Sequence, residues 1–336
     1  MPTTSPKPAN PSSSRGPAAA VRRAVASVSP TVTMWRDGLT IIALESREPS
    51  RTPDYLSFEQ AQAAKGIEVE EAPVQTVPTV DAATGPLPVL LLGGDTIIGG
   101  AQNRIINITI LLKAAAKTAI PVSCLEMGRW NDGRWFASAR PVDYAMRSMV
   151  AEQVTRGARA ARPGHAVPFA ADQGAIWHEI GERQARAAHR SPTQALHDVY
   201  DAEERSLEEW VRAFPMPAGT RGIAVGINDR LVGLDLFDSA ETLERQWPRL
   251  VGSAASALLD CQRAIQVGAV PMPKHRHVDT GALGRMLERA TTALTDATVA
   301  RSVGLGHDVR FSAPKLVGTA LVHDRRAVHV ALFRPA

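Results

Sequence analysis

The chain has 336 residues, of which 44% are hydrophobic and 21% are charged, and its formal net charge is +4. This length allows one large core or two modest ones. The small excess of positive charge argues against a nucleic-acid-binding protein, which gathers basic residues on one face, and no apolar run reaches the roughly 18 residues of a membrane span. We therefore expect neither a nucleic acid nor a membrane as a partner.

The N-terminal segment is rich in proline, serine and alanine and has no acidic residue before Asp37. Such a composition buries too little apolar surface to offset the entropy lost on ordering, so residues 1–29 are predicted to be a disordered tail. The cysteines Cys124 and Cys261 are too few for a disulfide framework and indicate a reducing compartment. The cytoplasm fits best, with an organellar transit peptide as the alternative for this acid-poor leader.

An apolar run, a short polar turn containing aspartate and a second apolar run recur along the chain. In the first example, Asp37 and Gly38 separate TVTMW from LTIIAL, which is a strong hairpin signal. Asp95, Asp229 and Asp324 lie in similar surroundings. Four hairpins predict a mostly antiparallel sheet, whether they reflect a duplication or only the usual turn chemistry of aspartate and glycine.

Helix signals lie between these hairpins. Ser57 begins a capping-box pattern, Asp172 and Ser239 are typical N-caps, and Ser191 precedes a proline at a first helical position. The longer helices are predicted over residues 141–159, 172–189 and 191–213, after Ser239, and over 280–300.

Helices and hairpins alternate without the regular strand–helix repeat of a doubly wound sheet. The predicted fold class is α+β, a mostly antiparallel sheet built from β-hairpins with several helices packed on it. Residues 30–336 are expected to form one domain. The alternative is a subdivision into β-rich parts, 30–140 and 215–336, and a helical part, 141–214.

The segment 88–130 holds the longest apolar runs and carries polar residues at intervals. These are Asp95, Gln102, Asn103, Arg104, Cys124, Glu126 and Arg129. Because an unpaired buried polar group costs about 1–3 kcal/mol, these side chains need partners or a ligand. The segment is the strongest site signal in the chain.

Glycines surround part of this polar set, at Gly93, Gly94, Gly99 and Gly100. Their backbone N–H groups could hold an anion, and Arg104 could grip a phosphate or carboxylate with two parallel hydrogen bonds. The segment lacks the GK[ST] of a P-loop. The alternative is that the glycines serve turns and bulges while Arg104 pairs with a carboxylate.

Three further positions carry residue types that are common in catalytic or metal sites: Cys124, the pair His178 and Glu182, and Asp235. Cys124 has no histidine nearby in sequence and fits a core position better than a nucleophile. Glu182 stands where a second histidine would complete a zinc motif after His178, so no metal site is predicted, and no cofactor is indicated. Asp235 alternates with leucines and is either a functional buried acid or half of a structural ion pair.

A register follows from the alternation of two predicted strands. Even-numbered residues from Ile106 to Leu112 form one apolar face and those from Ile120 to Cys124 form another, with a turn over 113–117. A five-residue loop sets Arg104 opposite Glu126. We therefore predict that these two residues are direct or diagonal cross-strand neighbours.

Four separated motifs carry a family resemblance: GGDTIIGGAQNRIINITILL, IPVSCLEMGRW, DQGAIW and GIAVGINDRLVGLDLFDSAETLERQWPRL. In this order they resemble the first of the protein domains associated with ADP-ribosylglycohydrolases and rhodanese-phosphatases, over residues 38–259 and the closing hairpin. In that family a glutamate usually stands at the position of Asp95. An aspartate there keeps the charge but has a shorter reach.

The resemblance implies a link to ADP-ribose or NAD-derived nucleotides and leaves two functions open. In the first, the protein is an enzyme or sensor for a phosphorylated nucleotide or sugar. Its anion would contact Arg104 and Arg129, its sugar or base would contact Gln102 and Asn103, and the acid, base or metal-binding groups would be Asp95, Glu126 and Asp235. In the second, it is a non-catalytic structural or adaptor protein with a buried polar network. The oligomeric state is not indicated.

Overall fold

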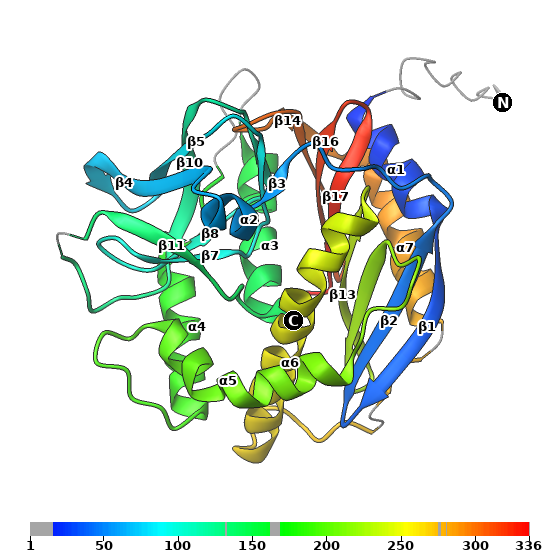
Figure 1. Cartoon of the computed structure of the whole chain (residues 1–336). Helices are drawn as coiled ribbons and strands as arrows, with labels where there is room; N and C mark the ends of the chain where they lie inside the picture. Colours follow the sequence, from blue (N-terminus) through cyan, green and yellow to red (C-terminus); the bar gives the residue numbers. More distant parts are fainter. Residues whose placement is uncertain (1–15, 132, 162–168, 275–276, 280, 336) are drawn as a thin grey trace, which may run out of the picture.

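The computed structural model describes residues 16–131, 133–161, 169–274, 277–279 and 281–335 (Figure 1). It confirms the α+β class and the predominance of antiparallel pairing. A large sheet lies on one side of the molecule and a small barrel on the other (Figure 1). Helix α3 (Tyr144–Ala160) packs against both, since Met146, Val150 and Val154 belong to the barrel core while the same helix contacts β13, β15 and β16 of the sheet.

In the described residues the large sheet has eight antiparallel strands. Their order is β1 (Val28–Arg36), β2 (Leu39–Ser46), β12 (Gly222–Ile227), β13 (Arg230–Phe237), β17 (Arg326–Phe333), β16 (Leu316–His323), β15 (His307–Ala313) and β14 (Thr298–Arg301). Helix α6 (Ala240–Gln266) covers one face, while α1 (Pro17–Ser27) and α7 (Ala282–Ala293) cover the other.

Burial on both faces explains the nearly continuous apolar runs of these strands. In β2, Leu39 and Ile41 join the core beneath α6, whereas Ile42 and Leu44 join the core beneath α1 and α7. Successive side chains of a strand point to opposite faces. A strand between two helical layers must therefore be apolar at odd and even positions alike.

Among the described residues, six strands close into a barrel in the order β10 (Lys117–Cys124), β5 (Thr79–Thr84), β4 (Ile67–Thr76), β11 (Trp135–Ala139), β7 (Thr96–Gly99) and β8 (Arg104–Ile106). A short sheet of β3 (Leu56–Ser57), β6 (Val89–Leu91) and β9 (Ile110–Leu112) adjoins it, with α2 (Phe58–Ala63) beside β3. The barrel interior is apolar along most of its length, with Val69, Val80, Ile97, Ile106 and Val122 buried.

Helices α4 (Gln173–Arg186) and α5 (Leu196–Ala213) pack with α6 below the barrel (Figure 1). The predicted N-caps Asp172 and Ser239 are confirmed, as is the Ser57 capping box. Helix α5 begins later than predicted because Ser191 Oγ accepts from Ala195 N in a turn that precedes the helix. Helix α7 ends at Ala293, and a 3₁₀ turn, Leu294–Asp296, leads into β14 instead of continuing to residue 300.

Three of the four predicted hairpins are confirmed, those around Asp37, Asp229 and Asp324. The hairpin around Asp95 is wrong, since β6 and β7 belong to different sheets. The Asp95 carboxylate accepts from Leu92 N, and Gly94 has φ +101, so the chain turns sharply here and leaves one sheet for another.

The prediction of a disordered tail is wrong for residues 16–29. Residues 17–27 form α1, and β1 begins at Val28. Ala20, Val21 and Val25 are buried against the large sheet, and this tertiary contact stabilises a helix too short to be stable alone. Residues 1–15 lie outside the described residues.

The direct form of the predicted register, with Arg104 opposite Glu126, is wrong by two residues. Strands β8 and β10 pair with Arg104 opposite Cys124, so Glu126 is the diagonal neighbour that the prediction also allowed. The predicted strand over 106–112 is interrupted after Ile106, and its second half, β9, pairs with β6. The loop 113–117 therefore does not join a hairpin, and closure of the barrel sets the register instead.

Within the described ranges, no helix is both long enough and apolar enough to cross a membrane.

Candidate functional site

The predicted site residues lie in three separate places. Gln102, Asn103, Arg104, Glu126 and Arg129 gather at one end of the barrel. Asp95 contacts α6, and Asp235 lies at the centre of the large sheet. The three candidate carboxylates, Asp95, Glu126 and Asp235, therefore do not share one site.

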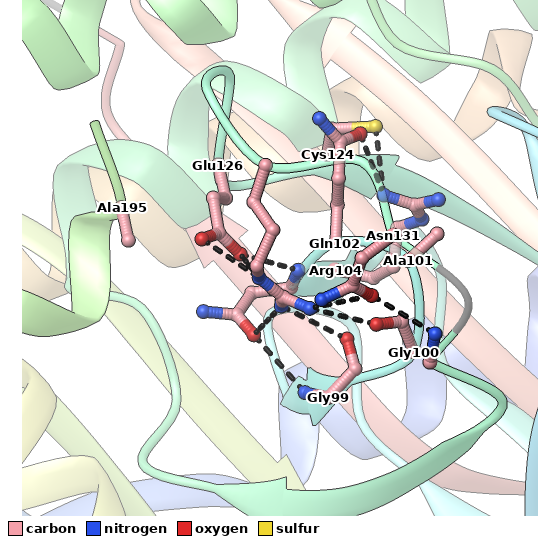
Figure 2. A network of polar contacts seen from close by, with 12 residues as sticks. Gly99, Gly100, Ala101, Gln102, Arg104, Cys124, Glu126, Asn131 and Ala195 are labelled. Carbon is pink, nitrogen blue, oxygen red and sulfur yellow. Dashed lines mark hydrogen bonds and ion pairs between the residues drawn. The ribbon is translucent and has the colours of Figure 1, made fainter. Parts of the chain in front are cut away.

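Arg104 is fully buried, and Figure 2 shows its guanidinium group beside Gln102 and Cys124. Its Nη1 donates to Gln102 Oε1 at 3.1 Å and to Cys124 Sγ at 3.0 Å, and its Nη2 lies 3.5 Å from Glu71 Oε1. Glu71 Oε1 also accepts from Ala101 N at 2.9 Å. Arg104 thus has a carboxylate partner inside the fold, as the alternative interpretation of this residue required.

Arg129 fixes the loop that follows β10. Its guanidinium forms an ion pair with Glu126 at 2.7 Å and donates to the backbone carbonyls of Gly99 and Gly100 at 3.1 and 2.7 Å. A further bond reaches Asn103 Oδ1 at 3.1 Å. This single side chain joins the loop to the turn between β7 and β8.

The glycines of this turn serve close packing rather than anion binding. Gly99 N donates to Asn103 Oδ1 and Gly100 N donates to the Trp135 carbonyl, so neither N–H is available to a ligand. Gly100 has φ +52, and a Cβ there would lie 2.1 Å from the Phe136 ring. A larger residue at position 100 would displace that ring.

Burial and neighbouring side chains change the pKa values of Cys124 and Glu126 at the barrel end. Burial raises the pKa of the Cys124 thiol to about 11, more than the nearby Arg104 lowers it, so Cys124 is a protonated core residue at neutral pH. Burial also opposes ionisation of Glu126, but hydrogen bonds from Arg129 and other neighbours bring its pKa below the usual range. Glu126 is therefore an ionised partner of Arg129.

Asp95 is buried beneath α6 and has two fixed partners. Its Oδ2 accepts from Leu92 N at 2.8 Å, and its Oδ1 accepts from Arg249 Nη2 at 2.9 Å. Arg249 also pairs with Glu59 at 3.0 Å. Burial raises the pKa of Asp95, although Arg249 acts against this effect. The Asp95 carboxylate thus links the turn between β6 and β7 to helix α6.

Asp235 is fully buried and is bound by three side chains, Tyr144, Arg147 and His329. Arg147 of α3 donates to both its oxygens, at 2.6 and 3.0 Å, and Tyr144 O–H donates at 2.6 Å. His329 Nε2 lies 2.9 Å from Oδ1, and its Nδ1 lies 3.0 Å from Thr109 Oγ1 on the barrel side. Burial acts against ionisation, but Arg147 and His329 hold the pKa of Asp235 well below its usual range. The network connects sheet, α3 and barrel.

In the described part of the chain, no group of three or more histidine, cysteine or acidic side chains could hold a metal ion.

A family model for the ARG and Rhodanese-Phosphatase-superfamily-associated Protein domain matches residues 28–333. The chain belongs to this family. The match begins earlier than the resemblance, which starts at residue 38, and it also covers the residues between 259 and the closing hairpin. The whole of the large sheet is therefore part of the family domain. No curated protein and no solved structure matches the chain.

Sequence reasoning missed the side chains that pair with Arg104, Asp95 and Asp235. These partners are Glu71, Arg147, Arg249 and His329. Glu71 carried one signal, since it follows Ile67 and Val69 at a spacing of two and so shares their buried face. The other three lie 88–154 residues from their partners, at distances along the chain where spacing has no predictive value.

The barrel end also presents apolar side chains to solvent. Met127 is 46% exposed, Trp130 53% and Trp135 55%. The Trp130 ring lies over the Arg104 guanidinium at 5.8 Å, and Trp135 is covered on one side by Arg134 at 4.9 Å. Large exposed aromatic groups on a loop that is held by ion pairs are typical of binding surfaces.

Proposed function

We propose that this protein is a non-catalytic binding protein or sensor whose ligand is a phosphorylated nucleotide or sugar related to ADP-ribose or NAD. The observation that carries the proposal is the exposure of Trp130 on a loop that Arg129 holds in place. The family name supports the ligand class, through its association with ADP-ribosylglycohydrolases.

The burial of the three candidate acids supports binding rather than catalysis. Asp95, Glu126 and Asp235 are 2%, 3% and 0% exposed, and each accepts from a guanidinium group. A general acid or base has to reach the proton that it transfers, directly or through one water. Acids enclosed by their own arginines do not meet that requirement, and they fit the scaffold of a binding site.

Stacking on the exposed indole of Trp130 would provide the main contact for a nucleobase. Such stacking contributes about 1–3 kcal/mol per base and needs no movement of the protein when the ring is already held. Arg129 is 24% exposed and lies on the same loop, where its positive charge would favour the ligand phosphate. The fixed loop lowers the entropy cost of binding.

Calorimetric titration with ADP-ribose, NAD, ADP and ribose 5-phosphate tests this function. Trp130→Ala should weaken nucleotide binding by about tenfold or more, since one stacked base is lost. Trp35→Ala is the matched control because Trp35 is equally exposed, at 53%, but lies on β1 of the large sheet. Ribose 5-phosphate has no base and should not discriminate between the two variants.

The possible outcomes separate the two functions. Binding to none of the four probes, or an equal loss in both variants, would favour a structural or adaptor protein instead. Conversion of ADP-ribose or NAD by the intact protein, followed by chromatography, would contradict the non-catalytic part of the proposal.

A further inference from the structure

A cavity lies beside α7. Figure 1 shows this helix on the far side of the large sheet from the barrel. The cavity has a volume of about 240 Å³. Four apolar or small residues and four cations line it: Leu231, Ala282, Met286, Leu316, Arg285, Arg289, Lys315 and Arg334. None of the four cations belongs to the sequence motifs that carry the family resemblance.

The four cations come from three different parts of the chain. Arg285 and Arg289 are one turn apart on α7, Lys315 lies in the turn between β15 and β16, and Arg334 follows β17. Arg285 forms an ion pair with Asp279. Over the described ranges, Arg289, Lys315 and Arg334 have no carboxylate within ion-pair distance.

Arg334 is the most constrained of these groups. Its backbone N donates to the Val232 carbonyl at 2.9 Å, and its side-chain Nε is buried without a hydrogen-bond partner among the described residues. Burial lowers the pKa of Arg334, and repulsion from Arg230 and Arg289 lowers it further, while Asp229 opposes them weakly. The fold therefore holds a partly buried guanidinium beside other positive charges.

We propose that this pocket binds a small phosphate-bearing anion, such as inorganic phosphate, pyrophosphate or the phosphate group of a sugar phosphate. Arg289, Lys315 and Arg334 converge without an ion-pair partner among the described residues and so repel one another, and a bound anion removes that repulsion while accepting charge-assisted hydrogen bonds. The pocket is slightly smaller than the roughly 300–1,000 Å³ of drug-sized sites, so a whole dinucleotide does not fit inside it. The site is independent of the proposed barrel-end site.

The test is calorimetric titration of the full chain with inorganic phosphate and pyrophosphate at constant ionic strength. The double variant Arg285→Gln/Arg289→Gln removes two exposed cations from α7 and keeps good helix formers in their place. It should weaken pyrophosphate binding by about tenfold or more, which corresponds to about 1.4 kcal/mol. Arg334→Gln, at the buried Nε, should weaken it as well.

The matched control is Arg156→Gln/Arg205→Gln, which removes the same charge from exposed positions on α3 and α5. It should leave binding within about twofold, because at about 0.15 M salt charges beyond about 8 Å are screened. Trp130→Ala should also leave pyrophosphate binding unchanged, which separates this site from the barrel end.

Phosphatidylcholine vesicles with and without phosphatidic acid distinguish a free anion from a lipid headgroup. Pyrophosphate binding without vesicle binding supports the proposal. Binding to the vesicles alone, absence of pyrophosphate binding, or equal losses in the α7 and control variants would overturn it.

Discussion

Arg104 at the barrel end and Arg334 beside α7 share one feature: in each, Nε is buried and has no hydrogen-bond partner among the described residues. Their surroundings differ. Arg104 has Glu71, Gln102 and Cys124 around its other nitrogens, whereas the cavity beside Arg334 is lined by further cations.

The presence or absence of a carboxylate partner distinguishes a structural arginine from one that is available to a ligand. A buried arginine with its own carboxylate has been desolvated during folding, and the pair keeps neighbouring strands in place. Cations that converge without a counter-charge make the fold less stable and are consistent with a ligand that supplies the missing charge. Arg104 belongs to the first kind and Arg334 to the second.

The largest effect is expected at Asp235, because its carboxylate is fully buried and two buried cationic or titratable side chains depend on it. Asp235→Ala leaves Arg147 and His329 buried without their carboxylate and should lower the free energy of unfolding by about 3–5 kcal/mol. Denaturant titration measures this loss, and Asp201→Ala, at an exposed position of α5, is the control. A loss below about 1 kcal/mol would show that this network does not hold sheet and barrel together.

Arg104→Met should lower the free energy of unfolding by about 3 kcal/mol, because it leaves Glu71 buried without a cation. Adding Glu71→Gln to this variant should restore part of the loss, since a neutral amide is less costly to bury. Denaturant titration of the two variants checks both expectations. If Arg104→Met were as stable as the native protein, Arg104 would not be a structural partner of Glu71 and would belong, like Arg334, to the cations without a counter-charge in the fold.

A pH effect is expected at His197, whose Nε2 lies 2.9 Å from Thr96 Oγ1 at the start of β7. Burial lowers the pKa of His197 from 6.5 to about 4. Between these values the unfolded chain binds the proton and the folded chain does not, so stability from this group is present above pH 6.5 and is lost as the pH falls towards 4. At pH 5 the loss should be about 2 kcal/mol.

Comparison with His197→Gln isolates this contribution. Burial raises the pKa of Asp238 to about 6, so protonation of Asp238 stabilises the fold as the pH falls and masks part of the histidine effect in the native protein. The stability difference between the native protein and the variant should shrink from pH 7.5 to pH 5. A constant difference would contradict the neutral, buried state of His197.

The smallest effect is expected beside α7. Arg289→Gln should change the free energy of unfolding by no more than about 0.5 kcal/mol, and towards higher stability, because it relieves repulsion at an exposed position. Adding pyrophosphate should raise the melting temperature of the native protein more than that of the variant. Loss of stability in the variant would indicate that Arg289 has a structural partner.

Much of the local structure was predictable because its causes are local. The Asp-Gly turn at Asp37 and Gly38, the N-caps Asp172 and Ser239, and the Ser57 capping box depend on neighbours within a few residues. The polar set of segment 88–130 was predicted to need partners or a ligand, and the structure shows partners for these side chains inside the fold. Its partners were not predictable, because Arg249 and Arg147 approach Asp95 and Asp235 only after α6 and α3 have packed.

The sequence by itself determined the α+β class, three of the hairpins and the family, since turn chemistry, helix caps and motif order are written in contiguous residues. Only the tertiary structure decided that the barrel closes, which register β8 takes against β10, and that residues 17–27 form helix α1. The same holds for the separation of Asp95, Glu126 and Asp235 and for the convergence of cations beside α7. These features depend on which surfaces meet when the chain buries its apolar area, and that choice is made by the packing of the whole molecule.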